Sequence, residues 1–277
     1  TAIPGVFCLA FFIGIYLWRD AAASPIATTI DSNIVADTVW TSAGSPYVVT
    51  GFVDVVDGVT LTIEAGVEVI VQSGSLRIVG ELYAEGTPTQ PITFTGPTSQ
   101  PGSWRGLYVV GDPGQRARIT LEHAILEYGG AMSINASNLT MSWTDATIRH
   151  SIFRYSAQHG LYSDDGSRVE LFENAFIHNT AAALVIEEME QDPRLEKLAA
   201  TGNGSDAIAV YGYQEIGRDG YTWEHPGLPF VIEDGIWVLK NGVLTIDPGV
   251  ELRFASGADL RIWGQINAIG AATQPIT

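Results

Sequence analysis

A long internal repeat constrains this sequence more than any other feature. Residues 61–93 and 244–277 align with one inserted residue, and 19 of 33 aligned positions are identical. Upstream of these segments Trp40 aligns with Trp223, so a whole module begins again. We predict four segments: a signal peptide or membrane anchor at 1–23, a linker at 24–36, a first module at 37–222, and the start of a second, truncated module at 223–277.

Within each module, apolar residues occupy every second position, which predicts short strands with one face buried. Glycines follow these strands at short intervals, as at Gly58, Gly66 and Gly74. Glycine permits positive φ, so such closely spaced strands suit a chain that coils rather than one that forms hairpins. The positions predicted to face the core are Leu61, Ile63, Val67, Val69, Val71, Leu76, Ile78, Leu244, Ile246, Val250, Leu252, Phe254, Leu260 and Ile262.

The middle of the chain repeats at a longer spacing. The segments 123–128, 150–155 and 174–179 superimpose on one another. Their spacing corresponds to about one turn of a three-sided parallel β-helix, in which like residues stack on like. In this alignment His123, His150 and Asn174 share one position, and Tyr128, Tyr155 and Asn179 share another.

Four motifs carry a family resemblance: GVTLTIEAGVEV (58–69), GSLRIVGELYAEGT (74–87), QPITFTG (90–96) and PGSWRGLYV (101–109). With them the sequence resembles right-handed parallel β-helix proteins of the pectin-lyase-like type, in particular bacterial secreted or cell-surface repeat proteins. The resemblance implies an all-β fold, a right-handed parallel β-helix solenoid. It covers about residues 37–277 and implies no particular activity, because these motifs are core ladders and turns.

One segment departs from the coil rhythm. In residues 187–200, Asp192 can cap a helix, Pro193 suits its first turn, and Arg194 to Ala200 are good helix formers. We therefore expect a short helical excursion from one coil.

Residues 2–18 form an uncharged apolar run, and Ala21-Ala22-Ala23-Ser24 follows it. This pattern is typical of a cleaved signal peptide, and the run is also just long enough for a membrane anchor. A buried core helix is the third alternative. The first two predict an extracellular or cell-surface location.

Composition excludes several function classes. Lys+Arg 14 against Asp+Glu 31 gives a net charge of −17, so the protein is not expected to bind nucleic acid. Cys8 is the single cysteine, which excludes intrachain disulfides, cysteine-based zinc sites and cysteine nucleophiles.

Enzymes of this fold that cleave polyuronic acids suggest one catalytic hypothesis. Polygalacturonases use paired aspartates, a nearby histidine motif and a basic clamp, and the candidates here are His159, Asp164, Asp165 and Arg168. The order is reversed, since the aspartate pair precedes the histidine in that family. Asp164-Asp165-Gly166 also reads as a tight turn. Catalysis is therefore the alternative: a polysaccharide lyase or glycoside hydrolase acting on a uronic-acid-containing glycan.

No resident cofactor is expected, although a lyase would need calcium. Its ligands would come from Asp164, Asp165, Glu170 and Glu173, with Arg149, Arg154 or Arg168 as the base. These carboxylates lack the spacing of a dedicated calcium loop. The stacked histidines could approach a metal, but a polar corner stack that satisfies backbone groups explains them better, and no metal site is assigned.

Tryptophan supplies the remaining hypothesis. Alternation through Leu260 and Ile262 places Trp263 on the outside, where an indole can stack on a sugar ring. Trp237 and Trp104 are further candidates for carbohydrate binding, and Trp143 and Trp223 are additional ones. The sequence thus favours a secreted or surface-anchored β-helix protein with a structural, adhesive or carbohydrate-binding role. Its expected partner is an extracellular polysaccharide or cell-surface component, and catalysis is less favoured.

Overall fold

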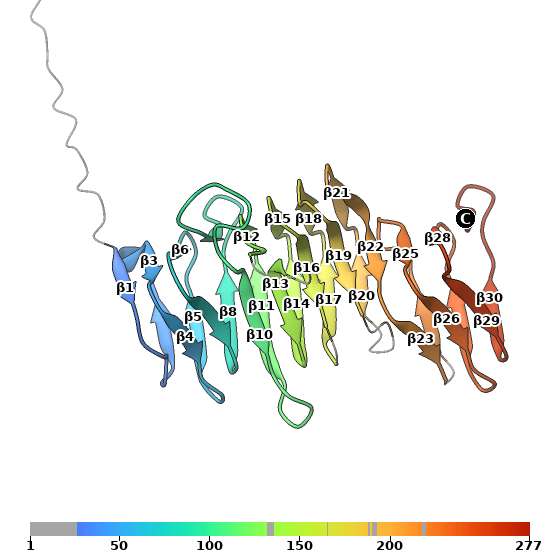
Figure 1. The fold of residues 1–277 in the computed structure, drawn as a ribbon, viewed down its shortest axis with the longest axis horizontal. Coiled ribbons are helices and arrows are strands. Elements are labelled where there is room, and N and C mark those ends of the chain that lie inside the picture. Colours follow the sequence, from blue (N-terminus) through green and yellow to red (C-terminus); the bar gives the residue numbers. More distant parts are fainter. Residues whose placement is uncertain (1–26, 132–135, 165, 188, 190–192, 218–219) are drawn as a thin grey trace, which may run out of the picture.

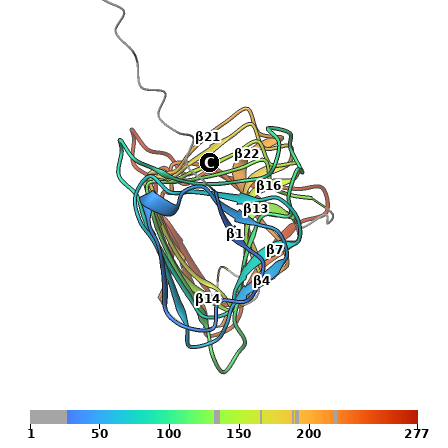
Figure 2. The ribbon, with the colours of Figure 1, turned by 90° about the vertical axis from the view of Figure 1, so that its left-hand side faces the viewer.

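The computed structural model describes residues 27–277 except 132–135, 165, 188, 190–192 and 218–219. The predicted leader and anchor segment, residues 1–23, lies outside this part. Within the described residues no helix is long and apolar enough to cross a membrane. The chain winds as a parallel β-helix, elongated in Figure 1 and three-sided when viewed end-on in Figure 2. The all-β solenoid predicted from the sequence is confirmed.

Three long parallel sheets form the sides of the coil. The nine-stranded sheet contains β4 (Phe52–Val55), β7 (Ser75–Ile78), β10 (Leu107–Val110), β13 (Ser137–Ser142), β16 (His159–Ser163), β19 (Ala182–Ile186), β22 (Ser205–Val210), β25 (Phe230–Ile232) and β28 (Leu252–Phe254). The eight-stranded sheet contains β1 (Thr28–Ile30), β3 (Tyr47–Val49), β6 (Glu68–Val71), β9 (Ile92–Thr95), β12 (Ala124–Glu127), β15 (Ile152–Arg154), β18 (Ala175–Ile177) and β21 (Ala199–Thr201). The seven-stranded sheet contains β2 (Thr38–Trp40), β5 (Thr60–Ile63), β8 (Glu81–Glu85), β11 (Ala117–Glu122), β14 (Thr144–Arg149), β17 (Arg168–Phe172) and β20 (Arg194–Glu196).

Two further three-stranded sheets belong to the last coils. One contains β23 (Tyr213–Ile216), β26 (Gly235–Val238) and β29 (Asp259–Ile262). The other contains β24 (Tyr221–Trp223), β27 (Val243–Ile246) and β30 (Gln265–Ala268). A single 3₁₀ turn, η1 (Ser42–Gly44), is the helical element of the described residues. Strand β1 shows that part of the expected linker already pairs with the first coil.

Alternation along each strand fills the core. Leu61 stacks on Leu82, and Leu82 on Ile119, so one apolar ladder runs through successive coils. All three side chains are fully buried, which stabilises the fold by about 1.5–3 kcal/mol for each large residue. The predicted inward positions from Leu61 to Ile78 are buried, as are Leu244, Ile246 and Val250.

Four predicted core residues are only partly covered: Leu252, Phe254, Leu260 and Ile262. Their register is inward, because Leu260 stacks on the buried Ile236 and Ile262 on the buried Val238. They lie in the last described coil, where a core residue has a described neighbouring coil on one side only. The predicted alternation was therefore right and the predicted burial was wrong.

The expected helical excursion is wrong for residues 194–200. Arg194–Glu196 forms β20 and Ala199–Thr201 forms β21, so both continue the sheets. Leu195 stacks on Leu171 and is buried, and this core contact outweighs the local helix propensity of the segment. Residues 190–192, which include Asp192, lie outside the described residues.

The corners of the coil hold non-glycine residues with positive φ. His123 and His150, with φ of 46° and 48°, stack in successive coils, and Glu173 takes the same corner in the next coil. The strand register agrees, since Ile152, two positions after His150, pairs with Ala175, two positions after Glu173. The predicted equivalence of Asn174 with His150 is thus one position out of step.

Buried asparagines satisfy the backbone beside these corners. Asn174 accepts a hydrogen bond from the Ser151 amide (2.9 Å) and donates one to the Ile148 carbonyl (2.8 Å). Asn179 does the same for the Ser156 amide and the Phe153 carbonyl, each at 3.0 Å. The polar stack expected from sequence is therefore present, with Asn179 level with Ser156 rather than with Tyr155.

The sheets change at the start of the second module. By the repeat, Phe230 is the equivalent of Tyr47, because each directly follows one of the aligned prolines Pro229 and Pro46. Yet Tyr47 belongs to the eight-stranded sheet, whereas Phe230 pairs with Ile208 in the nine-stranded sheet. The second module thus stacks on the first one sheet out of phase, and β20 and β21 end their sheets at this junction.

Candidate functional site

His159, the predicted catalytic histidine, is buried in β16. Its Nδ1 accepts a hydrogen bond from the Ala182 amide (3.3 Å), and its ring lies 5.7 Å from that of Tyr162. The imidazole therefore satisfies a backbone amide of the next coil.

Asp164 and Arg168 flank the turn that follows β16. The Asp164 carbonyl accepts a hydrogen bond from the Ser167 amide (3.4 Å), and Gly166 has a φ of 65°, as the tight-turn interpretation requires. Arg168 begins β17 on another side of the coil, 3.9 Å from the Asp145 carboxylate. Asp165 lies outside the described residues. Arg168 and His159 therefore interact with different parts of the coil.

Two carboxylates near this turn contribute to a raised pKa of a buried tyrosine. Tyr162 donates a hydrogen bond to Glu187, and burial together with that carboxylate raises the pKa of the Tyr162 hydroxyl. Asp164 adds to the same shift through its charge. The buried hydroxyl is thus held as a neutral donor rather than as a base.

The remaining calcium candidates are paired with cations. Glu170 lies 3.7 Å from Arg194, and Glu173 contacts Lys197 at 2.8 Å and His150 at 3.2 Å. The Lys197 ammonium is the main reason why the pKa of Glu173 is lowered. Among the described residues, no three His, Cys, Asp or Glu side chains gather closely enough to hold a metal ion.

An exposed aromatic surface lies on the sheet formed by β23, β26 and β29. Trp237 is its centre, with Tyr213 at 4.5 Å and Trp263 at 6.3 Å between ring centroids. Tyr213 and Trp263 are 55% and 57% exposed, whereas the flanking Ile236 is buried. Alternation along β26 thus turns the indole outward. We call Tyr213, Trp237 and Trp263 the aromatic face.

Charged groups hold the central indole of the aromatic face. The Trp237 Nε1–H donates to Asp259 (3.0 Å), and the Arg261 guanidinium lies 5.2 Å above the ring. Arg261 also pairs with Asp259 at 2.6 Å. The indole hydrogen bond, followed by the guanidinium, lowers the pKa of Asp259. These contacts fix the ring orientation, and the exposed Glu215, which lies opposite Trp237 in β23, leaves no excess of positive charge beside the ring.

Sequence reasoning placed two of these three residues correctly. Trp263 faces outward, as the alternation through Leu260 and Ile262 predicts, and Trp237, the further candidate from the sequence, lies beside it. Tyr213 was missed, because its buried neighbour Gln214 is polar and the apolar alternation along β23 is therefore interrupted. Trp104, by contrast, is buried and donates its Nε1–H to the Glu127 carbonyl (2.7 Å), so it presents no ring to a sugar.

The other two candidates have packing roles. Trp143 lies beneath the Arg116 guanidinium, 5.6 Å away, and Trp223 packs 5.1 Å from the ring of Phe230. Trp223 is 3% exposed and cannot join the aromatic face.

Comparison with known proteins agrees with this architecture. Residues 32–143 match the family described as the pectate-lyase like beta helix domain. That match covers the first part of the chain, and the parallel ladders continue the same β-helix architecture through the later coils. No curated protein and no solved structure matches significantly. The resemblance stated from the sequence motifs is confirmed at the level of the fold.

Proposed function

We propose that this protein binds a neutral extracellular or cell-surface polysaccharide through the aromatic face of its second module. The observation that carries the proposal is the outward group of Trp237, Trp263 and Tyr213, of which the first is held in place by Asp259 and Arg261. Exposed indoles stack on the apolar faces of sugar rings and need no catalytic acid to do so.

Charge favours a neutral ligand. The net charge of −17 repels an acidic polymer, and the cation nearest the aromatic face, Arg261, is already paired with Asp259. A location outside the cytoplasm belongs to the same proposal, supported by the apolar run at residues 2–18 and the small residues that follow it.

Catalysis is not part of the proposal. His159 accepts a backbone hydrogen bond, Asp164 closes a turn, and Arg168 pairs with Asp145.

Native gel electrophoresis in the presence of soluble polysaccharides tests the proposal. We expect a neutral glycan to retard the protein, pectin and alginate to retard it less, and Trp263→Ala or Trp237→Ala to abolish the retardation. Phe52→Ala is the matched control, because Phe52 is an exposed aromatic residue of the first module, 69% exposed. Retardation that persists in both tryptophan variants would contradict the proposed site.

A further inference from the structure

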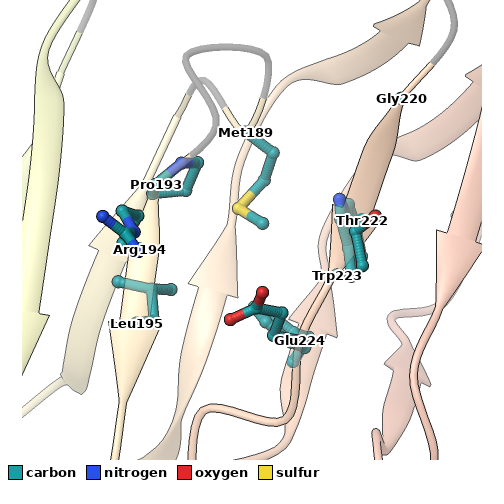
Figure 3. A pocket seen from close by; sticks show the side chains of 9 residues that line it. Met189, Pro193, Arg194, Leu195, Gly220, Thr222, Trp223 and Glu224 are labelled. Atoms are coloured by element: carbon teal, nitrogen blue, oxygen red, sulfur yellow. The ribbon is translucent and has the colours of Figure 1, made fainter.

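A slot lies between β20 of the first module and β24 of the second, away from the aromatic face. Its volume is about 260 Å³, and Figure 3 shows side chains from both strands around it. The lining residues are Met189, Pro193, Arg194, Leu195, Gly220, Thr222, Trp223, Glu224 and Phe230.

The restart of the repeat creates this slot. Trp223 in β24 is the equivalent of Trp40 in β2, and β2 is the first strand of its sheet. In the part of the chain that the structure describes, β24 pairs only with β27 and β20 only with β17. The strand edge found at β2, where the first module begins, therefore occurs again at β24, inside the molecule. The Leu198 amide donates to the Pro226 carbonyl (2.7 Å) and joins the two modules beside the gap.

The slot is lined by Trp223, whose single polar side-chain atom lacks a partner among the described residues. Trp223 is 3% exposed, and its Nε1 is buried without a hydrogen bond to any described residue. A buried donor left unsatisfied destabilises a folded protein, and such groups are rare. An acceptor oxygen on a bound molecule would remove this cost.

The lining defines the chemistry of that molecule. Met189, Leu195 and Phe230 supply apolar walls, while Thr222 and Glu224 add a hydroxyl and a carboxylate. Arg194 contributes a guanidinium, which lies 3.7 Å from Glu170. A ligand that fits needs hydroxyl groups that both donate and accept, together with an apolar face. The slot is smaller than the usual sites for drug-sized ligands, which begin at roughly 300 Å³, so it suits a single ring.

We propose that the slot binds one neutral polyhydroxylated ring, a single sugar unit or a cyclic polyol, with a ligand oxygen accepting the Trp223 Nε1–H. An extended peptide fits less well, because the two strand edges are only three residues long each. The site and its ligand stand independently of the function proposed for the aromatic face.

Indole ¹H–¹⁵N spectra of the full chain test this proposal. The probes are D-glucose, D-galactose, N-acetylglucosamine and myo-inositol, and Trp223→Phe assigns the Trp223 signal by removing it. We expect at least one probe to shift that signal saturably, with a Kd of about 1 mM, and Trp223→Phe to weaken binding of that probe about tenfold by ligand-observed NMR, the effect of one lost hydrogen bond.

Two controls separate this site from the rest of the molecule. Trp40→Phe changes the equivalent residue of the first module, which stacks on Tyr47 at 4.7 Å, and should leave binding unaltered. Trp237→Ala should also leave it unaltered, whatever it does to polysaccharide binding. A Trp223 signal that no probe moves, or that moves only with an extended Thr-Val peptide, would overturn the proposal. Unchanged affinity in a folded Trp223→Phe variant would overturn it as well.

Discussion

Equivalent strand pairs of the two modules carry different outward side chains. In the first module, Arg77 in β7 lies opposite Asp54 in β4 and pairs with it at 2.6 Å. In the second, Arg261 lies opposite Trp237 and covers its ring. Trp263 also takes the position of Val79 in the repeat. An outward ion pair in one module thus corresponds to an aromatic surface in the other.

This difference shows which parts of the repeat are constrained by the fold. The inward residues of the two strand pairs are alike, with Leu76 and Ile78 matched by Leu260 and Ile262. Outward positions do not contribute to the core, so they can change chemistry without changing the coil. The function of such a chain is therefore sought on the outside of its ladders.

The largest expected effect compares two equivalent core residues. Ile78 is completely buried, whereas Ile262 is 44% exposed. Ile78→Ala should lower the free energy of unfolding by about 2–5 kcal/mol, because it leaves a cavity between coils. Ile262→Ala should cost clearly less. Chemical denaturation of both variants measures the difference, and equal losses would contradict the assigned register.

The buried asparagines provide the next comparison. Asn179→Ala removes a side chain that bonds the Ser156 amide and the Phe153 carbonyl, and should cost about 1–3 kcal/mol. Asn267 is the control, since it accepts from Gln265 at an exposed site, and Asn267→Ala should change stability by about 0.5 kcal/mol or less. Thermal melting compares the two, and a harmless Asn179→Ala would show that the ladder is not structural.

Converting the second module to the pattern of the first tests the aromatic face. In the double change Trp237→Asp and Asp259→Ser, the new carboxylate lies opposite Arg261 as Asp54 lies opposite Arg77. We expect polysaccharide affinity to fall at least tenfold while stability changes by about 0.5 kcal/mol or less, as for other surface sites. Calorimetric titration and melting curves follow the two quantities. Affinity retained after this change would mean that the aromatic face is not the binding surface.

The smallest effect concerns pH. The pKa of Asp259 is lowered in the folded protein. The contribution of its carboxylate to the stability of the fold is therefore present above the unfolded pKa of about 3.9 and is lost as pH falls through the folded pKa. Glycan binding should thus be constant from pH 7 to about 5 and decline only below about pH 4. Asp259→Asn should remove that decline. A decline between pH 5 and 7 would point to another group.

Strand periodicity was readable from the sequence because every coil repeats the same inward alternation, as at Leu61 and Ile63. The aromatic face was partly readable for the same reason, through Trp263 beside Ile262. Leu195 was misjudged, because local helix propensity cannot show that its side chain fills a core ladder. The position of Phe230 in the nine-stranded sheet could not be predicted from the sequence either, since it depends on how the two modules stack.

The most direct test of binding at the aromatic face is a crystal structure of the protein with an oligosaccharide derived from a polysaccharide that retards it in the native gel. We predict a sugar ring stacked on Trp263 or Trp237, near Tyr213 and the Arg261–Asp259 pair. An oligosaccharide bound instead over Asp54 and Arg77 of the first module, or beside His159 and Asp164, would contradict it.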